Sequence, residues 1–390
     1  MRGTRHGLLL LLCLTAFACA PAAARPAVPA APGPPAPGDD GSAEPAPAWQ
    51  AEWDRTVAAA KQEGTVVVLA PPGDRLRQSV LDAFRAQFPD ITVEWSGGPS
   101  PDQAVKLEAE RRAGVYSTDV FIAGTAVALT QMKAAGALDP LPPALILPEV
   151  TDPANWRDGR LYFADTEGAL DLVFSGTPQM ALIYDPRQVR ADEVNSLDKL
   201  LDPKWKGRIA LEDPLSGGLP LTRFRFVWFV MGPEKGEAYI RALRAQLGVV
   251  DHDRRRLVEW IARGRYAIHF NPQQSMVQQL QQEGLTIGSV VEFKDYGAEL
   301  SAGPGSLMLL NQAPHPNAAK VFVNWLLSKA GQTAFESAVV MASRRLDVPT
   351  DYLPPELVPK PGVRYVDSSP EDYAVPPPEL MTLLKELFAN

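Results

Sequence analysis

Cysteine is scarce in this sequence, and its position limits what can stabilise the folded protein. The two cysteines, Cys13 and Cys19, both lie within the first 19 of 390 residues. The rest of the chain therefore forms no disulfide and no cysteine metal site. It must be stabilised by a packed hydrophobic core, and its length indicates two domains or lobes.

Other absences exclude whole classes of function. Lys and Arg number 38 against 46 Asp and Glu, which argues against a nucleic-acid partner because phosphates require a basic face. Beyond the N-terminus, no apolar run approaches the ~18 residues that a membrane-spanning helix needs. The G-x-S-x-G, H-E-x-x-H, Walker A and G-x-G-x-x-G motifs are all missing. The chain is therefore predicted to bind a ligand, not to be an enzyme, and to need no cofactor or metal.

Two of the four histidines invite a metal-site interpretation. His269 lies inside an apolar stretch, and His315 stands between two prolines ahead of a helix. Neither has a second ligand close by in the sequence. Both are predicted to be structural residues.

Residues 1–18 are interpreted as a signal peptide. Arg2 and Arg5 precede the apolar stretch GLLLLLCLTAFA, which is too short to span a bilayer as a mature helix. The four residues AFAC that end at Cys19 fit either an A-x-A cleavage site or a lipobox with Cys19 lipidated. We favour lipidation, although a lipobox usually carries Leu in place of Ala16. The reason is that residues 19–50 form an Ala/Pro-rich segment typical of a disordered spacer, which would hold an exported body off a membrane.

After this segment the pattern changes to alternating helices and strands. The β-branched run TVVVLA (65–70) is typical of a strand buried on both faces. Further strands are expected at 91–96 and 118–124, with a helix capped by Asp74 after the first strand and another helix from 125 to about 135. This order predicts an α/β fold with an open, mostly parallel sheet.

The same alternation continues toward the C-terminus. Strands are expected at 179–185, 208–213, 266–271 and 306–312, with helices between them. The proline-rich tail from residue 349 ends in one amphipathic helix, PELMTLLKELF.

Candidate ligand contacts lie in the loops that follow the predicted strands. Open α/β sheets bind ligands outside the carboxyl ends of their strands, where helix N-termini present backbone N–H groups. The glycine pairs in two of these loops are more typical of ordinary turns than of an anion site, and Arg254 reaches a ligand only if its helix begins there. The predicted contacts are Asp74, Arg75, Gly97, Ser100, Thr125, Ser216, Gly217, Arg254, Asn271, Gln273 and Gln274.

Four stretches carry a resemblance to a known family. They read LDAFRAQFPDITVEW (81–95), KLEAERRAGVYSTDVFIAG (106–124), SLDKLLDPKWKGRIALEDP (196–214) and APHPNAAKVFVNWLLSKAGQTAFE (313–336). Each resembles a signature of the bacterial extracellular solute-binding proteins of ABC importers, in the branch that includes the ferric-ion-binding proteins. The resemblance covers roughly residues 55–345, in the family's order.

The resemblance implies a type II periplasmic binding protein, in which two α/β lobes close on a ligand held between them. Lobe 1 would comprise residues 51–180 with a return segment at 301–348. Lobe 2 would comprise 181–300, and 349–390 would form the tail. The protein would be exported to the periplasm or cell surface, as a monomer anchored through Cys19, and would deliver its ligand to a membrane permease driven by an ATPase.

The resemblance leaves the ligand open. Ferric members hold iron with a tyrosine pair, but the corresponding loop here reads NPQQSM (271–276), and only Asp74 offers a carboxylate after the first strand. Ferric ion prefers anionic oxygen ligands, so a small organic anion or zwitterion recognised near Arg75 is favoured. The alternatives are a ferric ion or ferric chelate as ligand, and a sensor kinase as partner.

Overall fold

The computed structural model describes residues 47–216 and 219–389, within a compact unit that spans Ala46–Asn390. The predicted signal peptide, Cys19, Gly217 and the spacer as far as residue 46 lie outside the described residues. The first helix, α1 (Ala48–Glu63), begins before the predicted end of the spacer at residue 50. None of the helices in the described part is long and apolar enough to cross a membrane.

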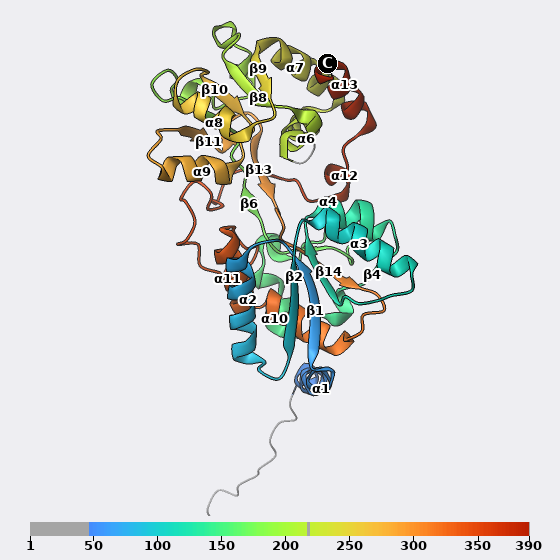
Figure 1. Ribbon diagram of the computed structural model, residues 1–390. Coiled ribbons are helices and arrows are strands. Elements are labelled where there is room, and N and C mark those ends of the chain that lie inside the picture. Colours follow the sequence, from blue (N-terminus) through green and yellow to red (C-terminus); the bar gives the residue numbers. More distant parts are fainter. Residues whose placement is uncertain (1–46, 217–218, 390) are drawn as a thin grey trace, which may run out of the picture. The chain divides into compact units, whose positions relative to one another are not determined.

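The first lobe is built on a six-stranded sheet (Figure 1). Strand β1 runs parallel to its neighbours β2 and β3, and β14 is antiparallel to β3, so the sheet is mixed where a mostly parallel one was predicted. The strand predicted at 65–70 is confirmed as β1. In spatial order the strands are β2 (Thr92–Gly97), β1 (Thr65–Ala70), β3 (Val120–Ala123), β14 (Ser306–Leu310) and β4 (Leu138–Asp139), with β5 (Leu172–Val173) also paired to β14.

Helices cover this sheet in contacting pairs. α1 lies against α10, and α2 lies against α11. The helix predicted from residue 125 is a short α-helical turn, α4 (Thr125–Val127), that continues as a π-helical segment, Ala128–Lys133. The helices of this lobe are α2 (Asp74–Gln87), α3 (Ser100–Arg112), α5 (Pro148–Thr151), α10 (Pro316–Leu327) and α11 (Lys329–Val339), in addition to α1 and α4.

The second lobe is built on a five-stranded sheet. β8 is parallel to β9 and β10, whereas β7 is antiparallel to β10 and β11. The spatial order is β11 (Gly288–Val290), β7 (Leu182–Tyr184), β10 (Ile268–Phe270), β8 (Ile209–Glu212) and β9 (Leu247–Asp251). The helices are α6 (Leu219–Met231), α7 (Pro233–Gln246), α8 (Arg254–Ala262) and α9 (Gln274–Gln282).

A small third sheet connects the two larger ones and takes in the tail. The chain passes from β5 to β7 through β6, and from β13 into β14, and β6 pairs with β13. The predicted tail contributes β15, which is parallel to β13, and its final helix is confirmed as α13. The elements are β6 (Thr177–Pro178), β12 (Glu292–Phe293), β13 (Gly297–Ser301), β15 (Tyr365–Asp367), α12 (Glu371–Ala374) and α13 (Pro378–Phe388).

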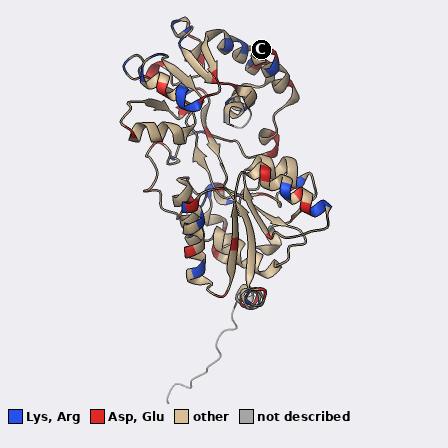
Figure 2. Cartoon of the chain, in the orientation of Figure 1, with Lys and Arg blue, Asp and Glu red and all other residues tan. Residues whose placement is uncertain are grey.

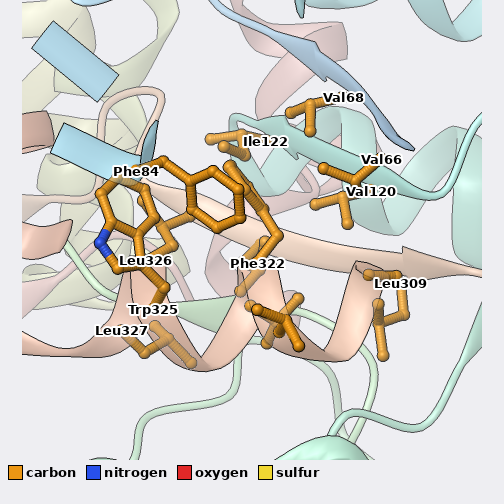
Figure 3. Close-up of a cluster of buried hydrophobic side chains, with 14 of the residues drawn as sticks. Val66, Val68, Phe84, Val120, Ile122, Leu309, Phe322, Trp325, Leu326 and Leu327 are labelled. Atoms are coloured by element: carbon orange, nitrogen blue, oxygen red, sulfur yellow. The ribbon is translucent and has the colours of Figure 1, made fainter. Parts of the chain in front are cut away.

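Charged side chains lie mainly at the surface and apolar side chains in the core, because burying an unpaired charge is costly. In Figure 2 the charged residues lie mainly on helices and connecting loops, and β1 carries none. Figure 3 shows the core of the first lobe, in which Phe84 of α2 meets Phe322 and Trp325 of α10. Their ring centroids lie 5.5 and 5.1 Å from that of Phe84. Buried aromatic pairs at these distances add to the stabilisation from buried area.

The two histidines are structural, as predicted. His269 is 1% exposed in β10, and its Nδ1 lies 3.2 Å from the carbonyl oxygen of Ala210. Burial lowers the pKa of His269 to about 4. His315 precedes α10, and its backbone N–H and its ring both bind the fully buried carboxylate of Asp119.

Candidate ligand-binding site

The parallel strands of the second lobe bring two predicted residues together. Arg254 is the first residue of α8, as its predicted role required, and the side chain of Asp253 caps that helix. Arg254 donates from Nε to Glu212 Oε1 at 2.6 Å and from Nη1 to Gln273 Oε1 at 3.4 Å. The structure therefore joins Arg254 to Gln273, but Glu212 already neutralises the cation.

The other predicted residues of this lobe surround the same edge. Asn271 is buried in the left-handed region at φ 63°, and Gln274 opens α9. The Oε1 of Gln274 and the Oε2 of Glu212 are buried acceptors with no hydrogen-bond partner among the described residues. The Ser216 hydroxyl lies 3.1 Å from Nδ1 of His252. This edge accepts hydrogen bonds more than it offers positive charge.

Four predicted residues of the first lobe follow the paired strands β1 and β2, whose ends meet at Ala70 and Gly97. Asp74 is exposed and is the first residue of α2; the N-cap is Gly73, so the predicted capping role of Asp74 is wrong. Arg75 donates from Nη2 to the carbonyl oxygen of Ser337 at 2.9 Å. Gly97 ends β2 and Ser100 begins α3. None of these four residues is among the described residues that line the cavity around Arg225.

Thr125, the remaining predicted residue, lines a cavity of about 150 Å³. It follows β3, in a position that the topology favours because β2 and β3 flank β1 on opposite sides. The opposite wall comes from α6 of the second lobe. The polar lining comprises Thr125, Thr222, Arg225, Ser301 and Ser368, with Gly303 and Ala374 beside them.

Arg225 supplies the positive charge of this cavity. Its Nη2 donates to Thr222 Oγ1 at 3.0 Å, and its Nη1 donates to the carbonyl oxygen of Ala374. The guanidinium carbon lies 5.7 Å from the ring centroid of Tyr373. Its Nε is buried with no partner among the described residues, and burial lowers the pKa of Arg225. A desolvated donor of this kind favours an anionic ligand.

A second arginine on the same helix fixes the position of α6. Arg223 is 1% exposed, and its Nη1 lies 3.3 Å from Oε2 of the equally buried Glu299 in β13. This ion pair ties α6 to the connecting sheet, from which Ser301 enters the cavity. α6 can therefore hold Arg225 steadily against the residues that follow β13.

The cavity lining lacks the chemistry of a ferric site. Among the described residues, no carboxylate and no tyrosine lines it. Across the described residues, no group of three or more His, Cys, Asp or Glu side chains could hold a metal ion. A hard trivalent cation requires anionic oxygen ligands, whereas an arginine with several hydroxyls suits an oxyanion.

Sequence reasoning missed Arg225, Thr222, Ser301 and Ser368. One signal was available, because the otherwise apolar helix LPLTRFRFVWFVM contains two arginines. Arginine is rarely buried without a partner or a function. Ser301 and Ser368 carry no such signal, since each reaches the cavity only through long-range strand pairing.

Comparison with known proteins identifies the family. A family model for bacterial extracellular solute-binding proteins matches residues 79–339. The chain belongs to this family. The membership confirms the predicted role as an exported solute-binding protein. No curated protein sequence matches the chain significantly.

Solved structures of solute-binding proteins are similar in fold. AfuA of Actinobacillus pleuropneumoniae with fructose-6-phosphate bound has a TM-score of 0.59 and 19% identity, covering 83% of this chain and 97% of its own. The Trichodesmium protein IdiA (FutA), in complex with iron and citrate, has a TM-score of 0.62 and 16% identity, covering 84% and 98%. Iron-bound HitA of Pseudomonas aeruginosa has a TM-score of 0.55 and 19% identity, covering 83% and 99%. These likenesses confirm the two-lobed type II periplasmic binding protein fold.

Proposed function

We propose that this solute-binding protein captures a small organic anion between its two lobes and performs no chemistry on it. Arg225 carries this proposal, because it is a partly buried cation beside the cavity whose Nε has no hydrogen-bond partner in the part of the chain that the structure describes. The hydroxyls of Thr125, Thr222 and Ser301 supply donors and acceptors for further oxygens of the ligand. A volume of about 150 Å³ accommodates an anionic head group, and a larger ligand would require the lobes to separate further.

The relatives offer both an anionic and a ferric ligand. AfuA was determined with a sugar phosphate, and HitA was determined with iron. The cavity around Arg225 supports the first kind of ligand, since a phosphate or carboxylate pairs with a guanidinium. A bare ferric ion beside Arg225 would be repelled by its charge and would find no anionic oxygen there.

Export and anchoring complete the proposal. Residues 1–18 act as a signal peptide, Cys19 is lipidated, and the Ala/Pro-rich segment that follows is the spacer. The body acts as a monomer, with lobe 1 at 51–180 and 301–348 and lobe 2 at 181–300. The predicted contacts Arg254 and Gln273, which share a hydrogen bond at the edge of lobe 2, belong to the proposed binding surface of that lobe.

The test is a thermal-shift and calorimetry screen of the mature chain against small carboxylates and phosphates, each paired with a neutral analogue. A bound anion raises the free energy of unfolding with the logarithm of its concentration relative to its dissociation constant, and so raises the melting temperature. Arg225→Gln should weaken the best anion at least about tenfold, the loss of one charge-assisted contact. The matched control is Arg241→Gln, whose side chain pairs with Glu237 and Glu386 on exposed helices. Equal affinity in wild type and Arg225→Gln would overturn the proposal.

A further inference from the structure

A second cavity, of about 440 Å³, lies on the other face of the connecting sheet. Its wall includes Leu300 and Asp367, whereas the cavity around Arg225 is lined by Ser301 and Ser368, the next residue along the chain in each case. Successive residues of a strand point to opposite faces, so the two cavities are separate. Nothing in the proposed function uses this second one.

Arg157 is the chemical centre of this cavity. The backbone is held in place because the N–H of Arg157 donates to the carbonyl oxygen of Arg344 at 2.8 Å. Its Nε is buried with no hydrogen-bond partner among the described residues. Burial, reinforced by the neighbouring Arg344 cation, lowers the pKa of Arg157. A desolvated guanidinium next to another cation gains strongly from an added anion.

The charges around Arg157 leave room for such an anion. Lys360 lines the cavity from the loop before β15. Of the two carboxylates in the wall, Asp367 is bound by Nη2 of Arg344, an arginine that is 3% exposed. Arg157 and Lys360 therefore face one further carboxylate, that of Asp158.

The rest of the wall is apolar. Leu300 and Leu346 line it together with Val363, so a ligand would meet hydrocarbon beside the two cations. Such a cavity matches an oxyanion attached to an apolar group better than a free inorganic ion, because burying the apolar part adds to the affinity.

We propose that this cavity is a second ligand site, which takes a small carboxylate or phosphate on an apolar body through Arg157 and Lys360. The ligand would join residues 157–158 to the loop that leads into β15. The inference is independent of the solute bound beside Arg225.

Benzoate and its neutral isostere benzamide are the probes. Calorimetry on the mature chain should show saturable one-to-one binding of benzoate and no binding of benzamide. Arg157→Gln should weaken benzoate at least about tenfold, whereas Arg225→Gln should leave the affinity unchanged. The matched control is Arg160→Gln, because Arg160 is an exposed neighbour that stacks on the ring of Tyr162 at 5.1 Å outside the cavity wall.

Two kinds of result would contradict the second site, and a further variant keeps the test possible if Arg157→Gln does not fold. The inference would be overturned if the wild-type protein does not bind benzoate at millimolar concentration. It would also be overturned if the protein binds benzoate and benzamide equally well. Loss of binding in Arg225→Gln with retention in Arg157→Gln would place benzoate in the solute cavity instead. Should Arg157→Gln fail to fold, Lys360→Gln changes an exposed side chain and must still weaken benzoate.

Discussion

Arg225 and Thr222 lie one turn apart on α6, and a 3.0 Å hydrogen bond joins Nη2 of the arginine to the threonine hydroxyl. Together with the bond to the carbonyl oxygen of Ala374, this bond occupies two guanidinium nitrogens, and Nε has no hydrogen-bond partner within residues 47–216 and 219–389. The arginine is thus held in place before any ligand arrives. Preorganisation of this kind lowers the entropy cost of binding.

The aromatic cluster of the first lobe should dominate its stability. Phe84 is fully buried against Phe322 and Trp325. Phe84→Ala should lower the free energy of unfolding by about 3–5 kcal/mol, because the lost transfer energy adds to that of a cavity. Val105→Ala, at a residue 60% exposed, is the control and should change it by less than about 0.5 kcal/mol. Equal midpoints for both variants in urea unfolding would refute the assignment of Phe84 to the core.

The C-terminal helix should behave as part of the folded body. Leu384 of α13 is fully buried in the core cluster of the second lobe. Leu384→Ala should cost about 2–5 kcal/mol in urea unfolding, whereas Lys385→Ala on the exposed face should cost little. A tail that is only a peripheral extension would give no difference between the two variants.

Glu336 should make stability fall as the pH rises. It is fully buried, and burial raises its pKa from 4.5 to about 8, against the opposing effects of the Ser175 hydroxyl and Arg344. Between these values the folded state keeps a proton that the unfolded state releases, so the free energy of unfolding decreases with pH. Glu336→Gln has no proton to lose and should gain stability relative to wild type from about pH 5 to 8. Parallel urea midpoints for the two proteins across that range would contradict the assignment.

Cys19 should determine where the protein fractionates. Cys19→Ser removes the thiol that a lipid anchor requires and should move the protein from the membrane to the soluble fraction. Cys13→Ser, within the predicted signal peptide, is the matched control and should leave fractionation unchanged. A membrane-bound Cys19→Ser variant would rule out the anchor.

Much of the fold follows from local pattern. The run at 65–70 is β1, and the amphipathic pattern PELMTLLKELF is α13, because each is decided by its own residues. β9 and β15 were not predicted, since such short strands are defined by their partners β8 and β13. The tail joins the folded body through the same kind of long-range strand pairing, between β15 and β13.

The candidate site was harder to predict for the same physical reason. Thr125 follows a well-marked buried strand, so topology alone places it beside the cavity. Arg225 lies inside a helix rather than at its start, and its exposure depends on how α6 packs against the tail. Arg75 and Arg254 look similar in the sequence, yet Ser337 and Glu212 bind them in the structure.

The most direct measurement is mass spectrometry of the mature protein purified under mild, non-denaturing conditions. A small organic anion released in one-to-one proportion from wild type, and absent from Arg225→Gln, is the expected result. Tight one-to-one ferric binding with a visible charge-transfer band, retained in Arg225→Gln, would contradict it.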